Sequence, residues 1–259
     1  MNINDLIKIK DNELPLDNLL ENGGYTNTFN TIAVIGDSLS SGEFEYVDKN
    51  NNTLFFDKYE FSWPSYISKM TGNKVYNFSR GGMSAKEFML TYAANNNYFD
   101  PKLKASAYII ALGVNDLICL KMALGDTSDV NSLNDTFARW YSDLIQKYKE
   151  ISPNAKFFFV TMPKENNHFD DLKEQHSNLL HELTKIYSNS YVIDLYKYGP
   201  TYDQEFKNKF YLEGHMNPAG YYLTAILISS YIDYIIRKDF KSFIQVGFIG
   251  TNEYKLELD

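Results

Sequence analysis

The chain has 259 residues, with only one cysteine, no long basic cluster and no long hydrophobic run. The single Cys119 excludes an internal disulfide framework and any zinc site built from cysteines. Acidic residues (33) outnumber lysine and arginine (25), which gives a net charge of −8 and a pI of about 5.1. A protein that binds nucleic acid through its phosphates is therefore not expected.

No segment is typical of export or membrane insertion. The first thirty residues contain no apolar run of signal-peptide length. The longest apolar stretch, residues 221–236, is short and is interrupted by Ser229, Ser230 and Asp233. We therefore predict a cytoplasmic protein with no membrane span.

Apolar runs of strand length alternate with segments of helical periodicity, which is typical of βα units around a parallel sheet. The 41 aromatic residues, 16% of the chain, are enough for a sizeable core. The expected strands are 31–35, 74–78, 107–112, 156–161 and 191–195, and the expected helices are 63–71, 84–95, 131–151, 169–187 and 218–237. We predict one three-layer α/β domain over residues 31–238, because no repeat or flexible linker divides it.

Three segments lie outside this alternation. Residues 1–30 form an N-terminal extension. Residues 43–61 alternate acidic and aromatic side chains around three asparagines, which predicts a β-hairpin inserted after the first strand. Its aromatic residues either cover a substrate or only pack the insert, and the sequence does not decide between the two. Residues 239–259 are expected to form a second hairpin packed on the domain, with its strands on either side of Gly250.

Polar residues and glycines follow the first three expected strands. Ser38 comes after the first strand, Gly81 and Gly82 after the second, and Asn115 after the third, while His215 precedes the last helix. Ligands of open α/β sheets bind beyond the carboxyl ends of the strands, so these residues share one edge. A serine, a base and fixed hydrogen-bond donors are what acyl transfer needs.

Four short motifs carry a resemblance to a known family. They read GDSLS at 36–40, NFSRGGMS at 77–84, GVND at 113–116 and GHMNPAGY at 214–221. In this order, and spread over most of residues 31–238, they resemble the SGNH hydrolases, the GDSL-type esterases and lipases. The G-x-S-x-G elbow of α/β-hydrolases is absent around Ser38.

The resemblance implies a fold and a set of roles. The fold is a flavodoxin-like sheet of five parallel strands in the order 2-1-3-4-5. Ser38 is the implied nucleophile, and its amide forms the oxyanion hole with the Gly82 amide and the Asn115 side chain. His215 is the implied general base. Gly82 is chosen over Gly81 only by alignment to the family motif, and either glycine also suits a tight turn.

The chain departs from the family at one position. The family usually has aspartate three residues before the histidine, where this chain has Leu212, which cannot orient an imidazole. Glu213 is a candidate orienting acid, because residues i and i−2 of an extended segment point the same way. Asp203 and Asp194 are further candidates. We favour a Ser–His dyad held by a backbone carbonyl, with Glu213 next.

We therefore predict a carboxylic ester hydrolase that works through an acyl-enzyme on Ser38, on a small acylated substrate such as a sugar ester, with no metal or organic cofactor. Two alternatives remain: an acyltransferase using the same serine, and a non-catalytic small-molecule binding module, which the lack of a P-loop and of G-x-G-x-x-G disfavours. The sequence does not predict an oligomeric state. We expect Cys119 to be a small buried residue, and His168, His176 and His181 to lie on the surface.

Overall fold

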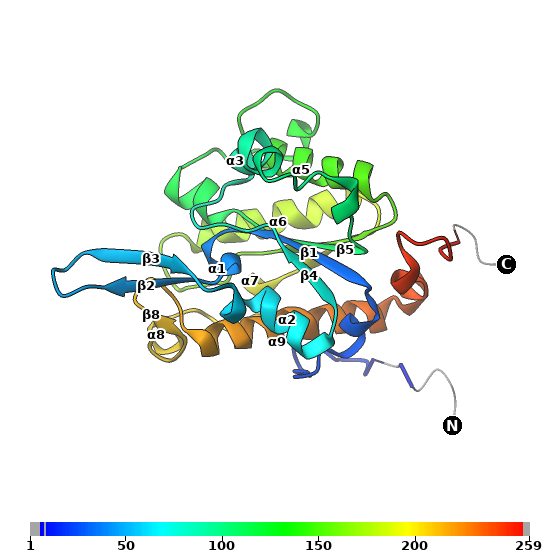
Figure 1. The fold of residues 1–259 in the computed structure, drawn as a ribbon, viewed down its shortest axis with the longest axis horizontal. Helices are drawn as coiled ribbons and strands as arrows, with labels where there is room; N and C mark the ends of the chain where they lie inside the picture. Colours follow the sequence, from blue (N-terminus) through cyan, green and yellow to red (C-terminus); the bar gives the residue numbers. More distant parts are fainter. Residues whose placement is uncertain (1–5, 8, 256–259) are drawn as a thin grey trace.

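The centre of the molecule is a parallel sheet of five strands (Figure 1). The computed structural model describes residues 6–7 and 9–255. The sheet strands are β1 (Thr31–Gly36), β4 (Lys74–Asn77), β5 (Ala107–Ala111), β6 (Lys156–Val160) and β7 (Ser190–Ile193). Their order is β4-β1-β5-β6-β7. Counted along the chain, this is the order 2-1-3-4-5, so the predicted fold class and strand order are confirmed.

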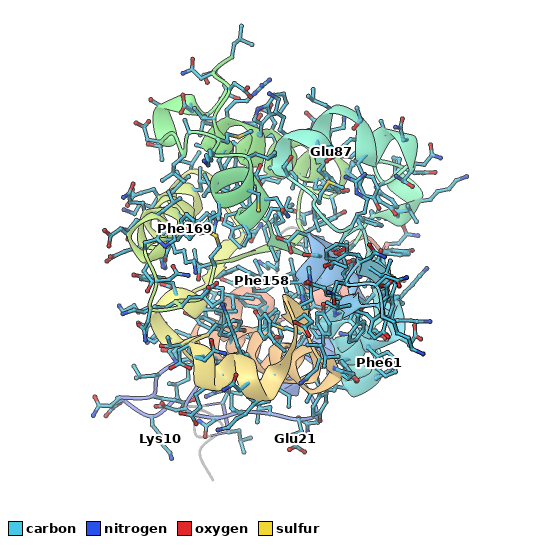
Figure 2. The ribbon with its side chains drawn as sticks, turned by 90° about the vertical axis from the view of Figure 1, so that its left-hand side faces the viewer. Lys10, Glu21, Phe61, Glu87, Phe158 and Phe169 are labelled. Atoms are coloured by element: carbon cyan, nitrogen blue, oxygen red, sulfur yellow. The ribbon has the colours of Figure 1, made fainter. Side chains whose placement is uncertain are left out.

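Helices cover both faces of the sheet (Figure 1). On one face lie α3 (Ala85–Glu87), α5 (Phe137–Ile151) and α6 (Asp170–Ile186), and on the other lie α2 (Trp63–Thr71) and α9 (Pro218–Lys238). Side chains of a strand alternate between the two faces, so β1 sends Ala33 and Ile35 to the first layer and Ile32 and Val34 to the second. Figure 2 shows Phe158 of β6 at the centre of the molecule, between the two helical layers.

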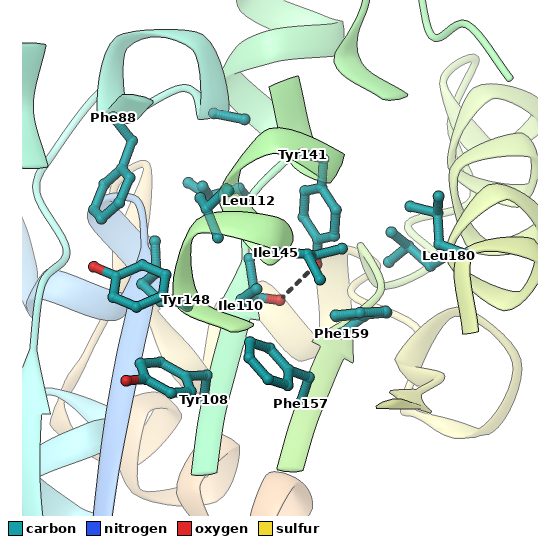
Figure 3. Packing of buried hydrophobic residues seen from close by; sticks show 14 of the residues in the cluster. Phe88, Tyr108, Ile110, Leu112, Tyr141, Ile145, Tyr148, Phe157, Phe159 and Leu180 are labelled. Carbon is teal, nitrogen blue, oxygen red and sulfur yellow. Dashed lines mark hydrogen bonds between the residues drawn. The ribbon is translucent and has the colours of Figure 1, made fainter. Parts of the chain in front are cut away.

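Aromatic side chains fill the layer under α5 and α6 (Figure 3). Tyr108 stacks on Phe157 with the ring centroids 5.1 Å apart, and both rings are fully buried. The hydroxyl of Tyr141 donates to the Ile110 carbonyl at 3.2 Å, so this buried polar group is satisfied. This layer packs β5 and β6 against the helices.

Shorter elements connect these layers. The short helices are α1 (Ser38–Ser41), α4 (Ala93–Asn95), α7 (Leu195–Tyr198) and α8 (Gln204–Phe210), with π-helical segments at Phe88–Tyr92 and Val114–Cys119. Turns of 3-10 helix lie at Gly24–Thr28, Tyr59–Phe61, Pro101–Leu103, Thr127–Asp129, Phe240–Phe243 and Val246–Phe248. Helix α5 begins six residues later than the predicted 131, because the Thr136 hydroxyl caps it at the Arg139 amide.

Two small antiparallel hairpins lie outside the main sheet. β2 (Glu43–Val47) pairs with β3 (Thr53–Asp57) and projects from the body of the molecule (Figure 1). β8 (Tyr211–Leu212) pairs with β9 (His215–Met216) directly before α9. The first hairpin falls inside the segment for which the sequence predicts an insert.

The C-terminal tail differs from the predicted hairpin. Residues 240–255 contain two turns of 3-10 helix and no strand, and residues 256–259 lie outside the described part of the chain. Phe243, Val246 and Ile249 are buried at a spacing of three, which is the period of a 3-10 helix and not of a strand. The tail therefore packs through one side of these turns.

Helix α9 is long and apolar enough, by length and composition, to cross a membrane, and it alone meets that criterion among the described residues. However, 78% of its most apolar window is buried inside the protein. It packs against α2 and the turn Gly24–Thr28, and the Thr26 hydroxyl donates to the Ser229 carbonyl at 3.0 Å. These contacts make α9 a core helix.

Candidate active site

Ser38 lies at the start of α1, directly after β1, at the end of the sheet from which the hairpin projects (Figure 1). The Asp37 side chain caps α1, because its Oδ1 accepts from the Leu39 amide at 3.0 Å. Gly36 leaves room for the Ser40 side chain, because a Cβ there would collide with it. Ser38 itself is only half-buried. This serine is thus held on a fixed turn with its side chain within reach of a ligand.

Gly81 and Gly82, which follow β4, are glycines for different reasons. Gly82 has φ +70°, and no atom lies within 4 Å of where its Cβ would be. Its backbone therefore needs glycine for conformation and lies open to solvent. Gly81 needs glycine for space, because a Cβ there would collide with the Glu43 carboxylate. Of the two glycines, Gly82 is therefore the one that is exposed and has open space beside its backbone.

Asn115 and Asp116 tie the loop after β5 to the loop after β4. Nδ2 of Asn115 donates to the Met83 carbonyl at 3.1 Å, and Oδ1 of Asp116 accepts from the Ala85 amide at 2.9 Å. Nδ2 has two hydrogens, so one remains for a ligand. Burial raises the pKa of Asp116 to about 6. The structure thereby brings Asn115 next to the Gly82 segment.

His215, at the start of β9, is enclosed by side chains of the β2–β3 hairpin. Nδ1 lies 3.2 Å from Oε2 of Glu45, and Nε2 lies 3.6 Å from Oε1 of Glu43. The Phe55 ring meets the imidazole edge-on, with the centroids 5.8 Å apart. Burial raises the pKa of Glu43, and the charge of His215 opposes that shift. The imidazole is therefore fixed between two carboxylates and an aromatic ring.

Tyr221 of α9 connects the serine turn to this hairpin. Its hydroxyl lies 2.5 Å from the Glu43 carbonyl, to which it donates, and 3.4 Å from the Ser38 carbonyl. Among the described residues no hydrogen bond joins the Ser38 side chain to His215. A catalytic hydrogen bond that is long without substrate often tightens when substrate binds.

A mostly apolar cavity of about 70 Å³ lies beside these residues. Its lining includes Leu39, Val114 and Met216, which are chain neighbours of Ser38, Asn115 and His215. In the described part of the chain, no three His, Cys, Asp or Glu side chains gather in a way that fits a metal ion. The arrangement offers a hydroxyl, an imidazole and two hydrogen-bond donors at one edge of the sheet, which is a set suited to acyl transfer.

The carboxylates proposed from the sequence lie elsewhere. Glu213 is exposed, has φ +51° and makes no hydrogen bond to His215. Asp203 caps α8 at the Phe206 amide, and Asp194 binds Nε2 of His181 at 3.0 Å. The left-handed backbone of Glu213 breaks the extended geometry on which its selection depended.

Glu45 is a side chain in contact with His215 that the sequence analysis did not consider. A signal for it was present, because Glu43 and Glu45 alternate with the apolar Phe44 and so share one face of a strand. The sequence does not show which part of the molecule that face contacts. The hairpin folds back over β9, which comes 170 residues later in the chain.

Two further expectations are wrong. His176 is fully buried rather than exposed, because it shares the apolar face of α6 with Leu179 and Leu180 and packs on Phe137. Burial lowers the pKa of His176 to about 4. Cys119 is exposed rather than buried, because it ends the π-helical segment on the outer surface.

Comparison with known proteins points to one family. The family model described as "GDSL-like Lipase/Acylhydrolase" matches residues 32–228. Among curated proteins, none matches the chain.

Several solved structures share the fold. A putative lipolytic protein of the G-D-S-L family from Desulfitobacterium hafniense is 17% identical, with a TM-score of 0.54 over 78% of this chain and 99% of that chain. A carbohydrate esterase family 2 enzyme with a carbohydrate-binding domain, from Corynascus thermopiles (Myceliophthora fergusii), is 14% identical, with a TM-score of 0.57 over 80% of this chain and 66% of that one. The acetyl xylan esterase AlAXEase is 19% identical, with a TM-score of 0.52 over 78% and 99%.

Proposed function

Because the chain belongs to the GDSL-like lipase/acylhydrolase family, we propose that it hydrolyses carboxylic esters through an acyl-enzyme on Ser38. The observation that carries the proposal is the meeting of four groups at one end of the sheet. Ser38 follows β1, Gly82 follows β4, Asn115 follows β5, and His215 stands before α9. β1 and β5 are neighbouring strands at the switch point of the sheet, where ligands of this architecture bind.

The reaction proceeds in two halves. Oγ of Ser38 attacks the ester carbonyl carbon, and its proton passes to Nε2 of His215. The amides of Ser38 and Gly82 and Nδ2 of Asn115 donate to the oxyanion of the tetrahedral intermediate. The intermediate collapses, and the alcohol leaves with the proton from His215. Water then attacks the acyl-enzyme by the same route and releases the carboxylic acid.

We propose a short acyl group on a sugar or similar small molecule as the substrate. Phe55 of the hairpin is exposed and lies against His215, and an exposed aromatic ring suits the apolar face of a sugar ring. The carbohydrate esterases among the structural neighbours support the same substrate class. A panel of acetylated sugars and nitrophenyl esters of increasing acyl length tests it.

The nucleophile is tested by labelling with a fluorophosphonate. We expect wild type to take up one equivalent at Ser38, and Ser38→Ala to lose labelling and hydrolysis by on the order of 10⁵–10⁶-fold. Ser79→Ala is the matched control, since Ser79 follows β4 at the same edge of the sheet and should leave both unchanged. An adduct on another residue, or full turnover by Ser38→Ala, contradicts the mechanism. Product analysis with added alcohols separates hydrolysis from acyl transfer.

A further inference from the structure

The carboxylate of Glu45 makes two hydrogen bonds at the candidate site. Oε2 lies 3.2 Å from Nδ1 of His215 and accepts from the Gly214 amide at 3.0 Å. Only 18% of the Glu45 side chain and 16% of the His215 side chain are exposed. An ionised carboxylate only accepts hydrogen bonds, so the proton in this contact belongs to Nδ1.

The hairpin is built to hold Glu45 in this place. Phe44, its neighbour in β2, points the other way, is buried, and packs edge-on against Tyr221 with the ring centroids 5.5 Å apart. Glu45 pairs with Phe55 across the hairpin, and that ring covers the imidazole. The alternation of strand side chains thus anchors one face of β2 in the core and presents the other to His215.

The base of the hairpin is closed as well. The Lys58 amide donates to the Gly42 carbonyl at 2.9 Å, and the Ser41 hydroxyl donates to Oδ1 of Asp57 at 2.7 Å. These bonds tie the hairpin to α1, the helix that carries Ser38. The serine and the carboxylate are therefore fixed to one another through a few residues of chain.

The segment around His215 makes room for the carboxylate. A Cβ on Gly214 would collide with Oε2 of Glu45. The φ of Gly214 is not in the left-handed region, so space rather than backbone conformation explains a glycine there. The lack of a side chain at Gly214 thus leaves room for Glu45, which comes from a strand distant in the sequence.

We propose that Glu45 is the positioning carboxylate of His215 and completes a Ser38–His215–Glu45 triad whose acid comes from the inserted hairpin. This inference rests on the proposed esterase function. By holding the proton on Nδ1, Glu45 leaves the lone pair of Nε2 free to receive the serine proton. Oε1 of Glu43 lies 3.6 Å from Nε2, which is beyond hydrogen-bond distance, so Glu45 is the carboxylate that bonds the ring.

The test compares Glu45→Gln with Glu213→Gln. Glutamine keeps the shape of glutamate, but its amide can donate to Nδ1 and so favours the wrong tautomer. We expect Glu45→Gln to lower kcat by about 10³–10⁴-fold with little change in KM, because the amide form of an orienting acid costs about that much in a serine triad. Glu213→Gln, an exposed neighbour of the same segment, should lose less than about tenfold.

A second readout does not depend on turnover. The ¹⁵N shifts of the ring nitrogens report which one carries the proton in neutral His215. We expect Nδ1–H in wild type and in Glu213→Gln, and a shift toward Nε2–H in Glu45→Gln. If Glu45→Gln does not fold, Gly214→Ala displaces the carboxylate without removing it and should give the same loss of kcat.

The outcomes separate the two proposals. Near wild-type kcat and an unchanged tautomer in Glu45→Gln overturn the role of Glu45, and a large loss in Glu213→Gln assigns the role to that residue instead. If wild type neither hydrolyses esters nor reacts with a fluorophosphonate, the proposed function fails. The tautomer measurement then still shows whether Glu45 holds the proton on Nδ1.

Discussion

Asn115 and Asp116 are adjacent, yet the structure uses them differently. Asp116 is fully buried and binds the Ala85 amide, so its part is to hold the loop after β4. Asn115 is half-buried, and one hydrogen of its Nδ2 is donated to the Met83 carbonyl. This bond fixes the direction of the second Nδ2 hydrogen. This orientation suits a donor that acts on the oxyanion.

We predict that Asn115→Ala lowers kcat by on the order of 10²–10³-fold, as loss of one oxyanion donor does elsewhere. KM should change little, because the developing charge exists in the transition state and not in the bound ester. Steady-state kinetics on one nitrophenyl ester measures both constants. An effect on KM alone would place Asn115 in substrate binding instead.

Single residues also show where the sequence was sufficient. Ser38, Gly82, Asn115 and His215 follow motifs whose spacing is local, and the structure brings them to one edge of the sheet. The contact between Glu45 and His215 was not predicted, because the two residues are 170 positions apart in the sequence. His176 was misjudged from its polar neighbours, although its spacing from Leu179 and Leu180 places it on the apolar face of α6.

Helices and strands with a regular spacing of apolar residues could be predicted from the sequence, whereas irregular segments could not. The helix expected at 63–71 has those bounds in α2, because Ser62 caps it, Pro64 follows in its first turn and Gly72 ends it in the left-handed conformation. The helix expected at 84–95 is broken by a π-helical turn at Phe88–Tyr92. The elements of the C-terminal tail are so short that the spacing of their apolar residues does not distinguish a strand from a 3-10 turn.

The N-terminus of α9 depends on Asn217. Oδ1 accepts from the Gly220 amide at 2.9 Å, and Nδ2 donates to the Lys209 carbonyl at 2.8 Å. We predict that Asn217→Ala lowers the free energy of unfolding by about 1 kcal/mol, and Tm by about 2–4 °C, through loss of this cap.

Thermal and urea unfolding measure this change. Asn208→Ala, on the exposed side of α8, is the control and should stay within about 0.5 kcal/mol of wild type. Equal losses in the two variants would mean that the cap contributes nothing specific.

For the whole molecule, the end of the sheet that forms the candidate site carries buried acids that resist ionisation. Asp37 is fully buried, and burial raises its pKa to about 7, with the charges of Asp116 and Glu43 acting in the same direction. Burial, opposed by backbone hydrogen bonds, raises the pKa of Asp116 to about 6. His176, behind the Asn115 loop, has its pKa lowered to about 4. These groups link the stability of the fold to pH with opposite signs.

The signs follow from where each proton is bound. The folded protein keeps the Asp37 proton up to about pH 7, whereas the unfolded chain releases it near 3.8, so this term lowers stability as the pH rises from about 4 to 7. The unfolded chain protonates His176 near 6.5 and the folded protein only near 4, so that term lowers stability as the pH falls across the same range. In wild type the two terms oppose one another there.

Asp37→Asn removes only the first term, because an asparagine oxygen still accepts from the Leu39 amide and caps α1. We predict that the variant matches wild type near pH 4 and gains relative stability as the pH rises. The gain should level off above about pH 7 at up to about 4 kcal/mol, the product of about three pKa units and about 1.36 kcal/mol per unit. Urea unfolding of both proteins from pH 4 to pH 8 at fixed ionic strength measures the difference. A difference that does not vary with pH would mean that Asp37 is ionised in the folded protein throughout this range, and that its burial does not raise its pKa.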